Sequence, residues 1–272
     1  MDLKLTGKTA LVTGSTAGIG LAIARRLAAE GASVIVTGRD QAKLDEAVAA
    51  VRAAASGQPG GPTQGAGPVR GVLADAGTAD GAAALAAAAP SVDILVNNLG
   101  IYGAAEFTDI TDAEWFRFFE VNVMSGVRLS RHYFPGMLAR DWGRIIFIAS
   151  DSAVVIPGEM IHYGMTKTAQ LAVARGLANL TKGTRVTVNT VMPGTTRSAG
   201  IETFMRSVAP DPAASADELE ATFFRTMRPT SLIQRLIEPE EIASLVAYVA
   251  SPLAAATNGA ALRAEGGIVP TI

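Results

Sequence analysis

The chain has 272 residues, of which 49% are hydrophobic and 18% charged, so intrinsic disorder of the whole chain is excluded. It contains no cysteine and two histidines, which excludes disulfide bonds, thiol catalysis and a cysteine- or histidine-rich metal site. The formal net charge of -2 argues against nucleic acid and anionic membranes as partners. No targeting segment and no run of about 18 apolar residues is evident, so we expect a cytoplasmic protein without a membrane partner.

Apolar runs alternate with helical patterns along the chain. Strands are predicted at residues 8–13, 33–37, 69–74, 93–97, 143–149, 184–191 and 260–263, and helices at 19–30, 41–55, 79–89, 112–140 and 163–180. Continuously apolar strands are typical of a parallel sheet that is covered on both faces. The pattern predicts an α/β fold: a single-domain Rossmann-like doubly wound parallel sheet of about seven strands, with helices on both faces. The Gly- and Pro-rich residues 56–68 are interpreted as a surface connection inside this one domain, residues 1–272.

A glycine-rich turn lies between the first strand and the first helix. Glycines there let backbone N–H groups approach a diphosphate, and the helix N-terminus adds free donors and a positive dipole end. The spacing Gly-x-x-x-Gly-x-Gly is neither Gly-x-Gly-x-x-Gly nor a P-loop, so a plain tight turn remains the alternative. The cofactor contacts expected from this turn are Gly14, Ser15, Thr16, Gly18, Ile19 and Gly20.

The end of the second strand should contact the adenosine ribose of a dinucleotide. It carries Gly38 and Arg39, with no carboxylate before Asp40, and a guanidinium suits a 2′-phosphate. We therefore expect NADP(H) to be preferred, with NAD(H) possible; a solvated Arg39 is the alternative. Asp75, just past the third strand, is expected to accept a hydrogen bond from the adenine amino group, or else to be a helix N-cap.

Tyr163 and Lys167 are four residues apart and lie on one face of a predicted helix. A neighbouring ammonium favours the phenolate and lowers the pKa of a tyrosine, which can then exchange a proton with an alcohol or ketone oxygen. Ser150 ends the fifth strand 13 residues earlier, where its hydroxyl could bind the substrate oxygen. Ser152 is the competitor for that role, and an ordinary surface Tyr-Lys pair is the alternative for the whole set.

Taken together, these motifs resemble the short-chain dehydrogenase/reductase (SDR) family over nearly the full length. The matching features are the Thr13-Gly14 to Gly20 turn, Asn97-Asn98-Leu99-Gly100, Asn122, Ser150 with Tyr163 and Lys167, Pro193-Gly194, and Glu265-Gly266-Gly267. The resemblance implies that Tyr163 is the general acid/base, that Lys167 holds the nicotinamide ribose, and that Ser150 orients the substrate oxygen. Asn122 would support a proton-relay water. The remaining cofactor contacts would be Asn98, Gly100, Pro193, Gly194, Thr195 and Thr196.

Two departures from the family pattern bear on the cofactor. Leu99 replaces the alanine of many members and adds bulk near the adenine side. Ala17 stands where a basic residue often lies, so the expected NADP preference depends on Arg39 alone. The family resemblance also implies a homo-oligomer, dimer or tetramer, through the helices at 112–140 and 163–180.

Residues 195–237 form an insertion that is expected to act as a lid over an apolar substrate pocket. Its aromatic side chains could instead only attach the insertion to the body. His162 is interpreted as structural or pocket-lining and His132 as structural; no metal ligand is expected.

The predicted function is an NADP(H)-dependent oxidoreductase that interconverts a ketone and a secondary alcohol, with a small-molecule carbonyl or alcohol as substrate. A 3-oxoacyl-carrier-protein reductase is one alternative, with Arg131, Arg140 and Arg144 as candidate carrier contacts. A non-catalytic dinucleotide-binding sensor on the same fold is a second possibility. A methyltransferase is a third, because it also follows its first strand with a glycine-rich turn.

Overall fold

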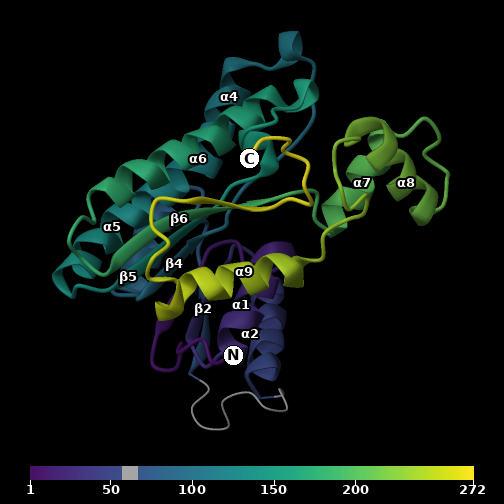
Figure 1. Ribbon diagram of the computed structural model, residues 1–272. Coiled ribbons are helices and arrows are strands. Elements are labelled where there is room, and N and C mark those ends of the chain that lie inside the picture. The colour runs from purple at the N-terminus through teal and green to yellow at the C-terminus, as the bar shows by residue number, and fades with distance from the viewer. Residues whose placement is uncertain (57–66) are drawn as a thin grey trace.

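The computed structural model describes residues 1–56 and 67–272 and contains a sheet of seven parallel strands in the order β3-β2-β1-β4-β5-β6-β7 (Figure 1). This arrangement confirms the predicted doubly wound fold. The order reverses between β1 and β4, and in open α/β sheets such a reversal leaves a crevice at the carboxyl ends of the strands. The strands are β1 (Thr9–Val12), β2 (Ser33–Gly38), β3 (Val69–Leu73), β4 (Ile94–Asn97), β5 (Gly143–Ile148), β6 (Val186–Pro193) and β7 (Ala261–Ala264).

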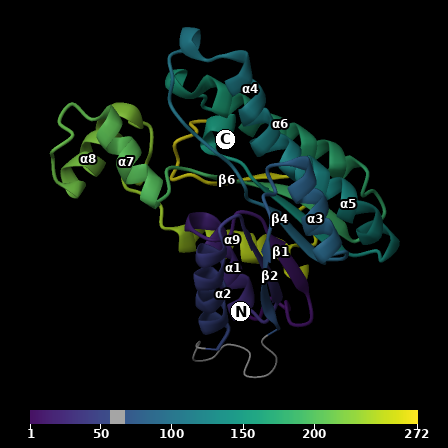
Figure 2. The ribbon, with the colours of Figure 1, turned by 180° about the vertical axis from the view of Figure 1, so that it is seen from behind.

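Helices cover both faces of this sheet, as Figures 1 and 2 show from opposite sides. One face carries α1 (Gly18–Ala29), α2 (Gln41–Ser56) and α9 (Pro239–Ala250), and the other carries α3 (Ala79–Ala88), α5 (Ser125–Ala139) and α6 (Ile161–Asn179). The helix α4 (Asp112–Phe119) precedes α5, while α7 (Ala199–Val208) and α8 (Ala216–Met227) stand beside the sheet. Single 3-10 turns lie at Phe107–Asp109, Asp151–Ala153, Gly158–Met160 and Pro252–Ala254.

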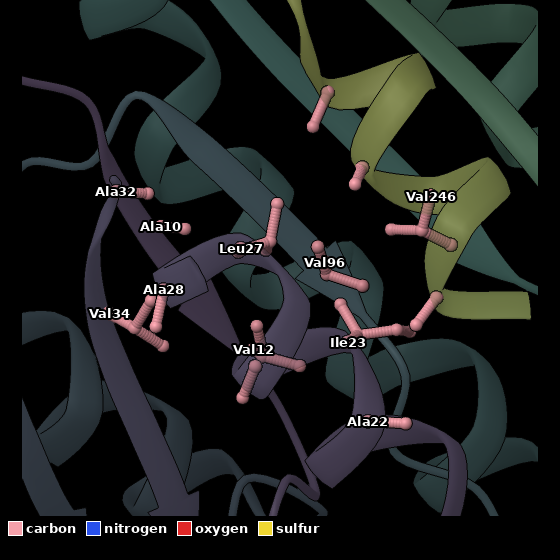
Figure 3. Packing of buried hydrophobic residues seen from close by; sticks show 14 of the residues in the cluster. Ala10, Val12, Ala22, Ile23, Leu27, Ala28, Ala32, Val34, Val96 and Val246 are labelled. Atoms are coloured by element: carbon pink, nitrogen blue, oxygen red, sulfur yellow. The ribbon is translucent and has the colours of Figure 1, made fainter. Parts of the chain in front are cut away.

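Alternate residues of the central strands fill two separate cores. Val12 of β1 and Val96 of β4 pack with Ile23 and Val246 from α1 and α9 (Figure 3), whereas Leu11 packs on the α3–α5–α6 side. Side chains that follow one another in a strand point to opposite faces, so continuously apolar strands supply both cores at once. This packing fixes the strand ends from which the functional side chains project.

The sequence reasoning did not predict α7, α8 or α9, and it expected one unbroken helix over residues 112–140. The structure interrupts it with a π-helical turn at Glu120–Met124, between α4 and α5. Asn122 lies in this turn, and its backbone carbonyl accepts a hydrogen bond from the Gln170 side chain of α6. Such a turn breaks the regular i to i−4 ladder, which makes a carbonyl available for a partner outside the helix.

The α7–α8 segment, residues 197–236, leaves the sheet beyond β6 and returns to it before α9. Thr196 and Ile237 form a parallel bridge at its base. Its own small core contains Met205, Phe223, Phe224 and Leu236, and Figure 1 shows it as a lobe beside the sheet. Residues 57–66 of the predicted 56–68 connection lie outside the described residues. None of the helices in the described part of the chain is long and apolar enough to span a membrane.

Candidate active site

Two adjoining cavities open at the carboxyl ends of the strands. The main cleft, of about 450 Å³, extends from the glycine-rich turn to the α7–α8 segment, and the side pocket, of about 460 Å³, lies towards β2 and β3. The two cavities share Gly14, Leu99, Gly100 and Ile101. Together they form a long site at the point where the strand order reverses, which suits an extended ligand such as a dinucleotide.

The glycine-rich turn has the shape of a cradle for a phosphate group. Gly14 and Gly18 have left-handed φ angles of 60° and 52°, which favour glycine. A Cβ on Gly20 would lie 2.5 Å from the Asn98 amide nitrogen, so this position also needs glycine. No side chain caps the N-terminus of α1, and its first turn has no acidic residue. The free N–H groups at this helix end therefore face the cleft without a competing carboxylate, as a diphosphate would require.

Two residues expected to contact the cofactor hold this turn in place, and of these Asn98 also lines the main cleft. The Asn98 amide donates to the carbonyls of Thr13 and Gly14 at 2.9 and 3.1 Å. The Ser15 hydroxyl is buried, donates to the Val12 carbonyl and accepts from the Thr37 backbone. The Ser15 backbone N–H donates to the Thr37 carbonyl. The side chain of Ser15 therefore connects β1 to β2, and it does not line either cavity.

The side pocket brings together the residues predicted to read the adenosine ribose. Arg39, Asp75, Thr16 and Gly38 all line it. The Arg39 side chain is 82% exposed, and its Nη1 lies 3.9 Å from Asp75 Oδ2. The other carboxyl oxygen of Asp75 accepts from the Gly77 backbone. The N-cap of α3 is Thr78, so the N-cap alternative for Asp75 is wrong.

The tyrosine and lysine of α6 face the main cleft, together with Ser150 at the end of β5. Lys167 is buried, and its Nζ donates to the Ile148 carbonyl at 2.9 Å and lies 5.6 Å from the centre of the Tyr163 ring. The structure thus brings Ser150, Tyr163 and Lys167 to one place. Ser152 lies behind Ser150, with its hydroxyl directed to Asp151 rather than to Tyr163.

Burial dominates the electrostatics of this group. It raises the pKa of Tyr163 above its ordinary value, while the nearby Ser150 acts in the opposite direction. It also lowers the pKa of Lys167 to about 7. The sequence reasoning expects Lys167 to lower the pKa of Tyr163; in this structure burial outweighs the Ser150 hydrogen bond and raises that pKa, and Lys167 is not among the groups that shift it. Tyr163 is therefore protonated at neutral pH and suited to donate a proton.

Asn122 is wholly buried, and its side chain does not face either cavity. Its amide accepts from the Ile101 backbone N–H at 2.7 Å, and donates to the Ile101 carbonyl and to the Thr166 hydroxyl. Its backbone carbonyl accepts from Gln170 Nε2 at 2.5 Å, and Gln170 Oε1 lies 3.4 Å from Lys167 Nζ. Gln170 thus takes one acceptor position of the Asn122 carbonyl, whereas the family resemblance implies only that Asn122 would support a proton-relay water.

The residues after β6 form the far wall of the main cleft. Pro193, Gly194, Thr195 and Thr196 all line it. A Cβ on Gly194 would lie 2.7 Å from the Glu265 carbonyl oxygen, so the turn that contains Glu265 supports this wall from behind. The Glu265 carboxylate in turn accepts from the backbone of Ile268 and Val269.

The substrate end of the cleft is less apolar than the sequence reasoning expects. Phe204 and Phe223 of the α7–α8 segment line it and also belong to the small core of that segment. Asp151 and Arg228 add opposite charges to the same lining, and Tyr102 stands edge-on to Tyr163, with ring centres 6.4 Å apart. Phe204 and Phe223 therefore border the cleft and also pack within the small core of the α7–α8 segment.

Several polar residues considered from the sequence lie outside the site. His162 packs on Phe118 with ring centres 4.1 Å apart, and burial lowers its pKa. His132 stacks edge-on against Tyr133. Arg144 is buried and donates to the Arg185 carbonyl, so it cannot contact a carrier, and this expectation is wrong. In residues 1–56 and 67–272, no cluster of three His, Asp or Glu side chains could hold a metal ion.

Sequence reasoning missed three residues of the site: Asp151, Gln170 and Arg228. Gln170 lies three residues after Lys167, so helical spacing alone would have placed it on the same face. Asp151 directly follows Ser150, but a neighbour in sequence usually points away from a strand end, and the 3-10 turn at Asp151–Ala153 brings it back. No sequence pattern around Arg228 indicates that its side chain lines the cleft.

Comparison with known proteins gives consistent matches over the whole chain. The family model described as short chain dehydrogenase matches residues 8–207. The chain is 53% identical to the uncharacterized oxidoreductase YvaG of Bacillus subtilis (strain 168), with 100% of both chains covered. It is 31% identical to the D-beta-hydroxybutyrate dehydrogenase of Cupriavidus necator, with 97% of this chain and 99% of that one covered. Among solved structures, the L-sorbose reductase of Gluconobacter frateurii, complexed with NADPH and L-sorbose, matches with a TM-score of 0.88 and 29% identity, and both chains are fully covered.

Proposed function

The chain belongs to the short chain dehydrogenase family and is an NAD(P)-dependent oxidoreductase, and we propose that it interconverts a ketone and a secondary alcohol with NADP(H). The observation that carries the proposal is the meeting of Ser150, Tyr163 and the buried Lys167 in one cleft with the glycine cradle. A proton donor beside a dinucleotide cradle is the arrangement that carbonyl reduction needs.

The proton chemistry follows from the environment of Tyr163. Because burial keeps the phenol protonated, Tyr163 donates its proton to the carbonyl oxygen as that oxygen becomes an alkoxide. To hold the same oxygen and stabilise the charge that develops on it, the Ser150 hydroxyl would turn its proton away from Asp151 Oδ1, to which it donates in this structure. Lys167, when charged, stabilises the phenolate that remains, and its lowered pKa lets it give up a proton more easily than a free lysine does. In the reverse direction, the phenolate accepts the proton of the alcohol.

The cofactor would lie along both cavities. Gly14, Gly18, Ile19 and Gly20 would hold the diphosphate, with Thr16, Gly100 and the backbone beside Asn98 completing the walls. When bound, the nicotinamide supplies or accepts a hydride at the carbonyl carbon. Pro193, Gly194, Thr195 and Thr196 would border the nicotinamide carboxamide. Arg39 supports the preference for NADP(H), because its guanidinium is accessible in the side pocket beside Gly38. Asp75 would accept from the adenine amino group.

We assign the whole chain to one catalytic domain in which the α7–α8 segment acts as a lid. Phe204 and Phe223 place its small core directly on the cleft, so movement of the segment would open or cover the substrate end. The carrier-linked alternative has less support, because Arg144 is buried and only Arg131 and Arg140 remain as surface candidates. A small-molecule substrate fits the cleft volume better than a carrier-bound chain does.

The non-catalytic sensor is disfavoured because dinucleotide binding alone needs no proton donor such as Tyr163 in the cleft. The sensor and the enzyme are separated by turnover. Purified protein would be incubated with NADPH and a panel of ketones, and oxidation of NADPH followed by absorbance. Steady turnover that falls at least about a thousandfold in Tyr163→Phe, with NADPH affinity retained, is expected.

Tyr248→Phe is the matched control, since it removes a surface hydroxyl on α9 and should leave the rate unchanged. Tight NADPH binding without turnover of any ketone or alcohol would contradict the enzymatic proposal. Full activity in Tyr163→Phe would contradict the assignment of the proton donor.

We also propose that the chain forms a homo-oligomer, dimer or tetramer. Phe116 and Phe119 of α4 are 72% and 39% exposed and lie near one another on one helix, as an interface would explain. Light scattering coupled to gel filtration gives the mass directly, and a monomer at micromolar concentration would contradict this proposal.

A further inference from the structure

The substrate end of the main cleft contains a carboxyl group that the proposed proton chemistry does not use. Asp151 lies next to Ser150 in sequence, is 6% exposed, and lines the cleft. Three donors converge on its Oδ1: the Ser150 hydroxyl at 2.7 Å, the Ser152 backbone N–H at 2.7 Å and the Ser152 hydroxyl at 3.3 Å. These bonds fix the orientation of the carboxyl group.

The second oxygen of Asp151 has no such set of donors. In the described part of the chain, no residue donates a hydrogen bond to Oδ2. Oδ2 is not one of the fully buried side-chain atoms that lack a partner, and an accessible oxygen that borders a cleft can obtain its donor from a ligand. The carboxyl group of Asp151 is thus held in place through Oδ1, while Oδ2 is available to accept a hydrogen bond from a ligand in the cleft.

Arg228, at the end of α8, limits which ligand Asp151 can take. Its side chain is 11% exposed and packs on the Phe223 ring at 5.4 Å, with Nη1 donating to the Met227 carbonyl and lying 3.4 Å from Glu159. It lines the same cleft as Asp151, and its positive charge acts on that carboxyl without forming an ion pair. A cationic ligand at Asp151 would meet this guanidinium, so a neutral donor such as a hydroxyl is favoured over an amine.

The position of Asp151 indicates where that hydroxyl lies in the substrate. Its Oδ1 is 2.7 Å from the Ser150 oxygen, which under the proposed function contacts the reacting carbonyl oxygen. Asp151 follows Ser150 in the chain and is hydrogen-bonded to it. When the substrate carbonyl oxygen contacts Ser150, the carboxyl group of Asp151 therefore reaches a substituent on the carbon next to that carbonyl. We propose that the enzyme acts on ketones that carry a hydroxyl on the adjacent carbon, and that Asp151 Oδ2 accepts the hydrogen bond of that hydroxyl. This inference rests on the proposed function.

The size of the expected preference follows from the loss of a hydrogen-bond partner. A site built for a hydroxyl leaves its acceptor unpaired when the hydroxyl is absent. We therefore expect kcat/KM to be at least about tenfold higher for a hydroxyketone than for a ketone of the same shape without the hydroxyl.

Matched substrates test this with the unaltered enzyme. Hydroxybutanone with its hydroxyl on the terminal carbon next to the carbonyl is compared with diethyl ketone, in which a methyl replaces the hydroxyl. Methoxyacetone, an isomer of that hydroxybutanone, keeps an oxygen at a similar place but has no hydrogen to donate. Under this proposal, only the hydroxyketone is favoured, and methoxyacetone behaves like diethyl ketone.

The variant Asp151→Asn then identifies the acceptor. An amide can keep an oxygen towards the Ser152 N–H, but it presents N–H donors where Oδ2 was, so the preference for the hydroxyketone should fall to about threefold or less whatever the absolute rates are. Asp141→Asn, on the surface and paired with Arg185, is the matched control and should keep both the rates and the preference. If Asp151→Asn does not fold, the comparison of hydroxyketone with methoxyacetone still decides the proposal.

The outcomes separate this inference from the function on which it rests. Turnover of diethyl ketone and the hydroxyketone with equal kcat/KM would overturn the inference and leave the proposed function standing. An unchanged preference in Asp151→Asn would overturn the role of Asp151. Turnover of no ketone at all would contradict the proposed function itself.

Discussion

Gln170 Nε2 lies 2.5 Å from the backbone carbonyl oxygen of Asn122 and so joins α6 to the π-helical turn between α4 and α5. The other end of the same amide, Oε1, lies 3.4 Å from Lys167 Nζ. Gln170 is buried, so neither contact is exchanged readily for water. This side chain therefore positions Lys167 and at the same time binds the Asn122 carbonyl.

Substitutions at Gln170 should move the pH profile of kcat in opposite directions. Gln170→Leu removes an acceptor of the Lys167 ammonium, so the pKa of Lys167 should fall further and activity should be lost at a lower pH. Gln170→Glu adds a negative charge beside the ammonium, which raises that pKa and moves the loss of activity to a higher pH. The measurement is kcat against pH for ketone reduction, at saturating NADPH and ketone.

Both Gln170 substitutions remove the hydrogen bond to the Asn122 carbonyl, so a purely structural role of Gln170 predicts the same shift of the pH profile in both variants. Shifts in opposite directions would show that Gln170 acts on the pKa of Lys167. Gln41→Leu, on the exposed start of α2, serves as the control and should leave the profile unchanged. Profiles that move in the same direction in the two Gln170 variants would show that the glutamine only joins the helices.

Arg39→Ala should separate the two nicotinamide cofactors. If the guanidinium binds the 2′-phosphate, its loss should weaken NADPH binding by about tenfold to a hundredfold, the value of a charged hydrogen bond, and change NADH binding much less. Dissociation constants from cofactor fluorescence give both numbers. Arg25→Ala, on α1 and 3.8 Å from Glu240, removes a comparable surface guanidinium and should alter neither. Equal losses for both cofactors in Arg39→Ala would rule out the phosphate contact.

Much of the fold was predictable because each strand is buried on both faces and reads as a continuous apolar run. Three helices, α7, α8 and α9, were not predicted, and the remaining errors are local and have local causes. The strand predicted from residue 184 begins at Val186, because the Thr184 hydroxyl donates to the Thr181 carbonyl and accepts from the Val186 N–H, which makes a turn there. The π-helical turn at Glu120–Met124 was not predictable, since apolar spacing does not show that the Asn122 carbonyl has a partner on another helix.

The site was predictable where one element holds the residues in register. Tyr163 and Lys167 share a face of α6. Ser150 lies just after β5, the strand that precedes α6, and lines the same cleft. The orientation of Ser15 was not predictable, because it depends on the neighbouring strand β2, which meets β1 only after folding. The same holds for Arg228, whose guanidinium lies over the Phe223 ring of α8 and borders the cleft only because the folded α8 lies beside it.

The glycine at position 20 should not tolerate even a methyl group. In Gly20→Ala the new Cβ would lie 2.5 Å from Asn98 Nδ2 and still closer to the Gly14 carbonyl, so the turn must shift. We expect a loss of about 1–3 kcal/mol in the free energy of unfolding and weaker NADPH binding. Urea unfolding and cofactor titration measure the two effects.

Gly176→Ala is the matched control, because a Cβ on this exposed glycine of α6 meets no other atom within 4 Å. It should raise the free energy of unfolding by about 0.5–1 kcal/mol, since alanine favours a helix, and leave NADPH binding unchanged. A Gly20→Ala variant with normal stability and normal NADPH affinity would mean that the turn can widen without consequence.

Lys167→Met should stabilise the cofactor-free protein in a way that depends on pH. Burial lowers the pKa of Lys167 from 10.5 to about 7 in the folded protein. Between these values the unfolded chain binds a proton that the folded protein lacks, so the free energy of unfolding of the wild type rises with pH, by up to about 1.4 kcal/mol per unit. Below pH 7 the full destabilisation is present. The stability advantage of Lys167→Met should therefore be largest near pH 7 and below, and shrink towards pH 10.

Urea unfolding of both proteins across this range gives the difference in the free energy of unfolding between variant and wild type at each pH. Lys182→Met, on the surface, is the control and should differ from the wild type by an amount that does not vary with pH. A constant difference for Lys167→Met would mean that Lys167 keeps its ordinary pKa in the folded protein.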